Sequence, residues 1–206
     1  MSPDSDRSGE RQRPDLARGS RERQRPVLPQ GHLPRLAREH YRGHAFVHWT
    51  LTLERRATGW LSPAFHHSWQ NILLHAGARY HLACPCYTLM PDHVHLLWIG
   101  TATASDQRLA IEFLRKHLAP HLVPATWQKQ AHDHVLRENE RERDAFHTVA
   151  HYIVQNPMRA SLVARWEDYA FTGCSVPGYP ELDPRADDYW LRFWRIHNYL
   201  VQSAAP

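Results

Sequence analysis

The sequence contains few cysteines, few glycines and no long apolar run. Three cysteines among 206 residues, an odd number, argue against a disulfide framework and favour a reducing compartment. No apolar stretch approaches the roughly 20 residues that a membrane-spanning helix needs. The amino terminus is polar and rich in arginine, without the pattern of a secretory signal. We therefore expect a cytoplasmic protein with no membrane partner.

Lysine is nearly absent as well. Of the 25 basic residues only Lys116 and Lys129 are lysines, and the formal net charge is +4. This moderate positive charge is compatible with an anionic partner but does not demonstrate one. Arginine forms bidentate contacts with phosphate, although the base composition of a genome can produce the same ratio. Histidine, by contrast, is abundant, with 17 residues.

The composition divides the chain into three parts. Residues 1–35 combine mixed charge, proline and serine with almost no periodic apolar pattern, which predicts a disordered basic arm. Ordered structure is expected over residues 36–175 as one domain. Residues 176–206 form an aromatic-rich tail that we expect to pack on this domain, and a stacking platform for bases is the alternative.

The order of apolar patterns predicts an α+β fold. The expected elements are a strand at 45–53, a helix capped by Ser62 and closed by Gly77, strands at 80–90 and 93–100, a helix at 106–119 capped by Ser105 and ended by Pro120, a short strand or extended loop at 127–137, and a helix at 144–155. This order is that of a ferredoxin-like split β-α-β arrangement. We expect an antiparallel sheet with its helices on one face.

Two His-x-His pairs occur, His93/His95 and His132/His134. A chain so rich in histidine produces such pairs by chance, so the spacing alone carries no information. His93 and His95 lie in a strong strand pattern, where residues two apart point to the same face and can bind one divalent cation. The other pair lies in a polar segment with a weaker strand pattern. Ordinary hydrogen-bonded or solvated histidines remain the alternative for both pairs.

Tyr152 and Asn156 lie four residues apart on one flank of the helix predicted at 144–155. Both fall beside the buried stripe that the apolar residues of this helix define. In the functional interpretation, Asn156 offers its carbonyl oxygen to a cation and Tyr152 serves as a nucleophile. In the structural interpretation, Tyr152 is a boundary residue and Asn156 helps to end the helix.

Three segments together resemble a known family. They are "MPDHVHLLW" (90–98), "WQKQAHDHVLRENE" (127–140) and "HYIVQNPMRASLV" (151–163). In this order and spacing they are similar to motifs of the REP-associated tyrosine transposases, within the single-tyrosine HUH-type transposase superfamily. The resemblance covers roughly residues 40–175. Two positions depart from it: Asp92 stands where the family usually has Asn, and Ser161 where it usually has Gly.

The resemblance implies a set of site residues. Tyr152 would be the catalytic nucleophile, His93 and His95 the metal-binding pair, and Asn156 the third metal ligand. The cofactor would be a divalent metal, Mg²⁺ or Mn²⁺. Arg159 and Arg137 are candidate contacts to DNA phosphates, with solvated surface charge as the alternative.

The implied activity is metal-dependent transesterification of single-stranded DNA, through a 5′-phosphotyrosine intermediate at hairpin-flanked sites. The partner would be single-stranded DNA with hairpin (palindromic repeat) structure. A homodimer is a possible assembly, since the superfamily contains both dimers and monomers. Two alternatives stay open: a metal-dependent hydrolase that activates water at His93 and His95, and a non-catalytic protein that binds DNA hairpins.

Overall fold

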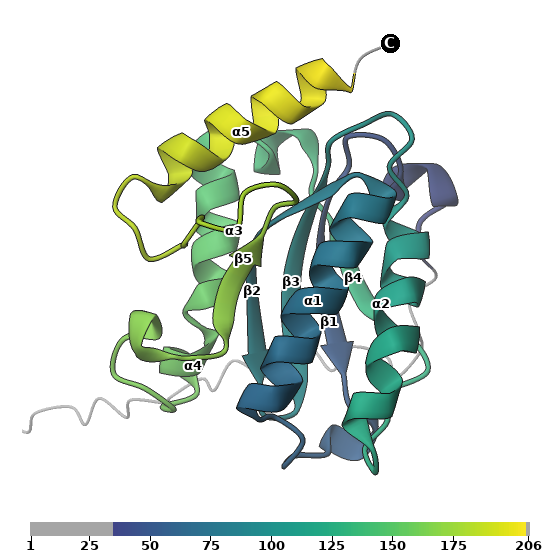
Figure 1. Ribbon diagram of the computed structural model, residues 1–206, viewed down its shortest axis with the longest axis vertical. Helices are drawn as coiled ribbons and strands as arrows, with labels where there is room; N and C mark the ends of the chain where they lie inside the picture. Colours follow the sequence, from purple (N-terminus) through teal and green to yellow (C-terminus); the bar gives the residue numbers. More distant parts are fainter. Residues whose placement is uncertain (1–34, 205–206) are drawn as a thin grey trace, which may run out of the picture. The chain divides into compact units, whose positions relative to one another are not determined.

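The computed structural model describes residues 35–204, so the arm predicted for residues 1–35 lies essentially outside the described residues. Five strands form one antiparallel sheet in the order β4-β1-β3-β2-β5 (Figure 1). Their bounds are β1 (Phe46–Thr52), β2 (Leu82–Met90), β3 (His93–Gly100), β4 (His132–Val135) and β5 (Thr172–Ser175). The central strand β3 pairs with β1 on one side and β2 on the other.

Helices connect and cover these strands. They are α1 (Pro63–Tyr80), α2 (Gln107–Leu122), α3 (Arg143–Val154), the single turn α4 (Asn156–Arg159) and α5 (Tyr189–Ser203). Short 3-10 turns lie at Arg38–Tyr41, Glu54–Arg56, Glu138–Glu140 and Trp166–Asp168. None of the helices within residues 35–204 is both long and apolar enough to cross a bilayer.

The order β1-α1-β2-β3-α2-β4 confirms the predicted α+β split β-α-β fold. The antiparallel partners of β3 run parallel to each other, and α1 makes the crossover between them. The expectation that helices cover one face holds for α1 and α2, which lie side by side in Figure 1. The opposite face carries Leu97 and Ile99 and is covered by α3 and α5, because apolar side chains on both faces of a strand need cover on both.

Two details of α1 and α2 follow from local chemistry. Ser62 caps α1 as predicted, its hydroxyl accepting the backbone N–H of Phe65 at 3.1 Å. The cap of α2 is Asp106, not Ser105, and its carboxylate accepts two backbone N–H groups of the first turn. The predicted end at Pro120 is wrong: α2 continues to Leu122, whose burial in the core offsets the hydrogen bond that proline cannot make.

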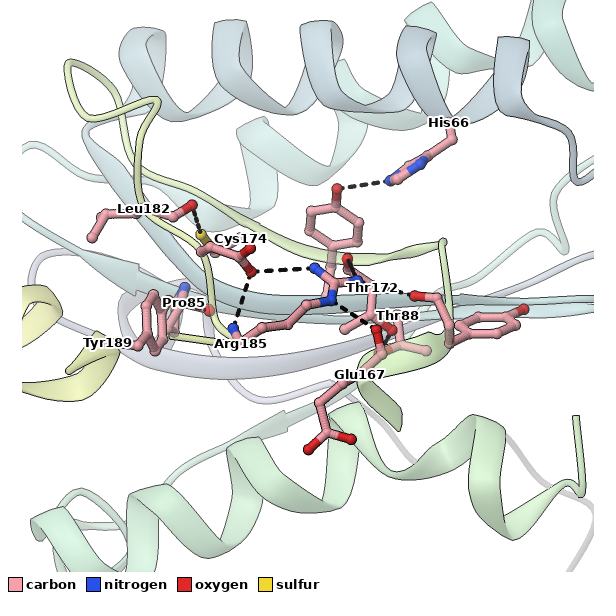
Figure 2. A network of polar contacts seen from close by, with 12 residues as sticks. His66, Pro85, Thr88, Glu167, Thr172, Cys174, Leu182, Arg185 and Tyr189 are labelled. Atoms are coloured by element: carbon pink, nitrogen blue, oxygen red, sulfur yellow. Dashed lines mark hydrogen bonds and ion pairs between the residues drawn. The ribbon is translucent and has the colours of Figure 1, made fainter. Parts of the chain in front are cut away.

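The helix α5 completes the apolar core on this face of the sheet. Its Tyr189 and Phe193 are buried with Phe146 of α3. Arg185 ties the chain before α5 to the sheet edge, as Figure 2 shows. Its guanidinium donates to the backbone carbonyls of Glu167 (2.9 Å) and Thr172 (3.1 Å). The aromatic-rich C-terminal segment thus packs on the same sheet as the rest of residues 35–204.

Candidate functional site

A row of polar side chains crosses the whole sheet at one level. The register pairs one residue of each strand with the next, in the order His132, Thr50, His95, Thr88 and Thr172. Directly paired residues point to the same face of a sheet, and this is the face that α3 covers. On one side of the row lies the apolar core that contains Leu97 and Ile99.

An open cavity of about 420 Å³ lies beside this row. The residues that the sequence predicted as metal ligands and nucleophile all line it: His93, His95, Tyr152 and Asn156. β3 supplies the histidines, and α3 with the turn that follows it supplies the other two. The fold therefore brings together residues that lie about sixty positions apart in the chain.

The two histidines point their outer ring nitrogens at each other. Nε2 of His93 and Nε2 of His95 are 3.1 Å apart. The other ring nitrogen of each histidine, Nδ1, has a partner of its own. Nδ1 of His93 donates to a carboxylate oxygen of Asp92 at 2.6 Å. Nδ1 of His95 lies 3.0 Å from Nε2 of His48 on β1. A carboxylate can only accept, so the proton of neutral His93 is on Nδ1 and a lone pair is on Nε2.

Burial keeps His95 and His48 uncharged at neutral pH. The pKa of His95 falls to about 3, mainly because burial disfavours the imidazolium, and further because His48, His93 and Arg56 are close. The pKa of His48 falls to about 4, again mainly through burial and then through His134. Neutral imidazole is the form that binds a metal ion.

Tyr152 projects from α3 into the cavity with 42% of its surface exposed. Its ring centroid lies 6.2 Å from that of His95. The guanidinium of Arg159 lies over the ring of Tyr152, 4.5 Å from its centroid. An arginine at this distance makes a cation–π contact that orients the ring. The structure thus places Arg159, predicted to contact phosphate, directly beside the predicted nucleophile.

Asn156 has its amide orientation set by the end of α3. Its Nδ2 donates to the backbone carbonyls of Tyr152 (2.8 Å) and Ile153 (3.1 Å) in the last turn of α3. Only the amide nitrogen can donate to carbonyls, so Oδ1 is the atom directed elsewhere. Within residues 35–204 no side chain donates a hydrogen bond to this oxygen.

The donor atoms present fit a small divalent cation. Two ligands in adjacent positions of an octahedron, each about 2.1 Å from the metal, are about 3 Å apart, close to the 3.1 Å between the two Nε2 atoms. An amide oxygen and neutral imidazoles belong to the donor types of such ions. Within the described part of the chain, no group of three or more histidine, cysteine or carboxylate side chains could hold a metal. A cation here would therefore depend on Asn156 and on substrate or water oxygens.

Other predicted residues lie away from this cavity. His134 is half-exposed and its Nε2 contacts a carboxylate oxygen of Glu140 at 2.9 Å. The backbone N–H of Arg137 donates to the same carboxylate at 2.7 Å, and Arg137 does not line the cavity. Of the second histidine pair, only His132 lines the cavity.

Several lining residues escaped the sequence analysis: Thr50, Thr52, Arg56 and Gln128. Thr50 and Thr52, with His48, occupy alternate positions of β1, and this polar alternation could have indicated them. Gln128 reaches the cavity because its backbone N–H donates to the carbonyl of Thr52 at 2.9 Å. No local pattern predicts such a long-range contact.

Comparisons with known proteins extend this description. No protein-family model matches the chain, and no curated protein matches it. Among solved structures, a REP-associated tyrosine transposase bound to a REP hairpin is similar with a TM-score of 0.56 and 18% identity, over 68% of this chain and 82% of that chain. A putative transposase from Deinococcus radiodurans has a TM-score of 0.39 and 16% identity, over 57% of this chain and 96% of that chain.

A bacterial tRNA(His) guanylyltransferase (Thg1)-like protein in complex with GTP also aligns, with a TM-score of 0.40 and 9% identity, over 78% of this chain and 93% of that chain. TM-scores of 0.39 and 0.40 are too low to establish a shared fold. The first match confirms, at the level of the fold, the resemblance that the sequence motifs indicated. The chain has the fold of a REP-associated tyrosine transposase.

Proposed function

We propose that this protein is a metal-dependent single-stranded DNA transesterase that cuts and rejoins strands at hairpin-flanked sites through a 5′-phosphotyrosine intermediate. The observation that carries the proposal is the cavity in which Tyr152 faces two imidazoles whose Nε2 atoms converge. The fold of the chain is similar to that of a REP-associated tyrosine transposase whose structure contains a REP hairpin. Fold similarity alone would not identify a reaction.

In the proposed reaction, the phenolic oxygen of Tyr152 forms a bond to phosphorus while the bond from phosphorus to the 3′ oxygen breaks. The phenol gives up its proton as its bond to phosphorus forms, the 3′ oxygen takes up a proton and leaves as a hydroxyl, and the 5′ phosphate stays on the tyrosine. Attack of a 3′ hydroxyl on this link reverses the step and joins two strands. The phosphodiester energy is conserved in the covalent link, so the reaction needs no nucleotide cofactor.

His93, His95 and Asn156 would hold the cation, which we propose to be Mg²⁺ or Mn²⁺. When bound, such an ion polarises a phosphate oxygen and neutralises charge in the transition state. Asp92 and His48 hold the rings of the two histidines in place. Arg159 orients the ring of Tyr152, and Arg56 adds a positive charge to the cavity.

The proposed DNA partner is a single strand that folds into a hairpin. Arg56 and Arg159 lie at or beside the cavity, with guanidinium groups that suit phosphate oxygens. The side chain of Arg56 is exposed and contacts a carboxylate oxygen of Asp92 at 3.1 Å. Such contacts position a DNA backbone without reading its sequence.

A denaturing-gel assay for covalent adducts tests the proposal. The protein is incubated with labelled single-stranded hairpin oligonucleotides from its flanking genomic DNA, with Mg²⁺, with Mn²⁺ and with chelator. Tyr152→Phe and His93→Ala run in parallel, and Tyr199→Phe, an exposed tyrosine on α5, serves as the matched control. We expect a metal-dependent band of reduced mobility with the parent protein and the control, and no band with the other two variants.

Two other outcomes would contradict the transesterase. Cleavage without an adduct that survives Tyr152→Phe would identify a metal-dependent hydrolase, with water as the nucleophile. Salt-sensitive hairpin binding without cleavage, unchanged by chelator, would identify a non-catalytic hairpin-binding protein.

A further inference from the structure

A second hollow region lies on the other flank of α3, away from the cavity of Tyr152. It consists of two cavities, of about 330 Å³ and about 360 Å³. His147 of α3 and Trp190 of α5 border both of them, so the cavities adjoin along these two helices. Trp166 also lines the first cavity, and Trp194 also lines the second. We call this region the α3–α5 groove.

The aromatic rings of the groove hold one another in place. The rings of His147 and Trp190 have centroids 4.5 Å apart with planes inclined by 33°. Nε1 of Trp194 donates to Nε2 of His147 at 3.2 Å. Each of these side chains is half-buried, so part of it packs on the core and part borders the groove. Rings fixed in this way lose little freedom when a flat ligand stacks on them.

Positive charge accompanies the rings. Arg143 and Arg195 line the second cavity and are both exposed. Neither forms an ion pair within residues 35–204, whereas the neighbouring Arg192 lies 3.4 Å from Glu181. Aromatic rings interspersed with unpaired arginines are the surface that binds single-stranded nucleic acid, with bases on the rings and phosphates on the charges.

The groove lies next to the proposed site of chemistry. His151 lines its first cavity, and the following residue, Tyr152, lines the catalytic cavity on the other flank of α3. An α-helix with its side chains is about 10–12 Å across. A short run of nucleotides could therefore connect a phosphate at Tyr152 with a base in the groove.

We propose that the α3–α5 groove binds unpaired bases of the DNA strand that reacts at Tyr152, with one base in the cavity of Trp166 and Trp190. The proposal rests on the proposed function for the identity of the strand. The cavity of about 330 Å³ is at the small end of the roughly 300–1,000 Å³ of ligand sites, which suits a single base. The charge of Arg143 and Arg195 favours a polyanion over an apolar peptide.

Fluorescence anisotropy at fixed salt tests the groove without requiring cleavage. The probes are a blunt hairpin, the same hairpin with an unpaired extension at its 5′ or its 3′ end, and an unstructured oligothymidine. Trp166→Leu and Arg195→Gln alter the groove, and the second is an exposed change that should not affect folding. Tyr199→Leu and Arg165→Gln are matched controls outside both cavities.

We expect one extension to strengthen binding about 5- to 100-fold, the range given by stacking of a base on an aromatic ring. Both groove variants should lose most of this gain, keep their affinity for the blunt hairpin, and differ from the two controls. No gain from either extension, or a gain that survives both groove variants, would overturn the proposal. Oligothymidine that binds through Trp166 and Arg195 in a protein that never cleaves would support the groove while the transesterase fails.

Discussion

At the scale of single residues, Asp92 places a negative charge against the histidine pair. Its two carboxylate oxygens contact Nδ1 of His93 at 2.6 Å and the guanidinium of Arg56 at 3.1 Å. The carboxylate therefore fixes the ring of His93 with Nε2 turned toward His95. A carboxylate behind an imidazole also fixes the tautomer of the ring.

We expect Asp92→Ala to weaken Mn²⁺ binding about 10- to 100-fold, the usual cost of losing such a partner. Asp92→Asn should cost less, because its amide oxygen can still accept from Nδ1 of His93. Isothermal titration with Mn²⁺ measures both, and Asp144→Asn, an exposed change in the first turn of α3, is the control. Unchanged affinity in Asp92→Ala would show that this carboxylate does not organise a metal site.

Ser161 is a second departure from the family's pattern, and the backbone shows what it costs. Its φ is +55°, in the left-handed region, just after the turn of α4. A residue with a Cβ is strained there, whereas glycine is not. The glycine that the resembling family usually carries thus corresponds to a real backbone requirement, which this chain meets with serine.

Ser161→Gly should raise the free energy of unfolding by about 0.5–1 kcal/mol, the relief of left-handed strain less the entropy of an added glycine. Ser175→Gly in the extended strand β5 is the matched change, and it should lower the same quantity by about 0.5–1 kcal/mol. Urea denaturation measures both. Equal losses in the two variants would contradict the strain argument.

At the scale of elements, α1 forms where the sequence signals a helix start. The hydroxyl of Ser62 accepts the N–H of Phe65, and Pro63 occupies the first helical position, where no N–H is needed. The buried side chains of Phe65, Trp69 and Leu73 then hold the helix against the sheet. The cap thus fixes where α1 begins, and the buried side chains fix which face of it meets the sheet.

Ser62→Ala should lower the free energy of unfolding by about 1 kcal/mol, because one N–H of the first turn loses its partner. Ser62→Asp keeps an acceptor and places a negative charge at the positive end of the helix, so it should be neutral or slightly stabilising. Thermal or urea denaturation distinguishes the pair. If both variants lose the same stability, the hydroxyl of Ser62 is not acting as a cap.

At the scale of the whole molecule, Arg185 joins the C-terminal segment to the sheet. Its guanidinium donates to three backbone carbonyls: Glu167 at 2.9 Å, and Tyr169 and Thr172 at 3.1 Å each (Figure 2). Glu167 and Tyr169 belong to the chain that leads into β5, and Thr172 is the first residue of β5. One planar side chain thus holds the approach to β5 and the approach to α5 together.

Arg185→Lys should lower the free energy of unfolding by about 2 kcal/mol, because an ammonium cannot reproduce the fork of donors. Arg192→Lys is the matched control, since Arg192 makes one exposed contact to Glu181 at 3.4 Å and should change stability by less than about 0.5 kcal/mol. Urea denaturation of both variants measures the difference. Equal effects would mean that the Arg185 contacts add no more than a surface ion pair.

Local pattern carried enough information to predict the split β-α-β order, the Ser62 cap and part of the lining of the Tyr152 cavity, namely His93, His95 and Asn156 beside Tyr152 itself. Alternation in β3 placed His93 and His95 on one face, and helical spacing placed Tyr152 beside Asn156. These are properties of a strand and a helix taken singly. The roles of these residues in metal binding and catalysis remain predictions until the adduct assay is made.

Pairing between distant segments supplied the rest, because no short stretch of sequence records its spatial partner. The sheet register aligned His132, Thr50 and His95 in one row and paired His134 with His48 in a neighbouring row. Packing of α5 against α3 created the groove of Trp190 and His147 from residues more than forty positions apart. Periodicity thus determined which side chains share a face of one element, and the burial of two apolar cores determined which faces meet.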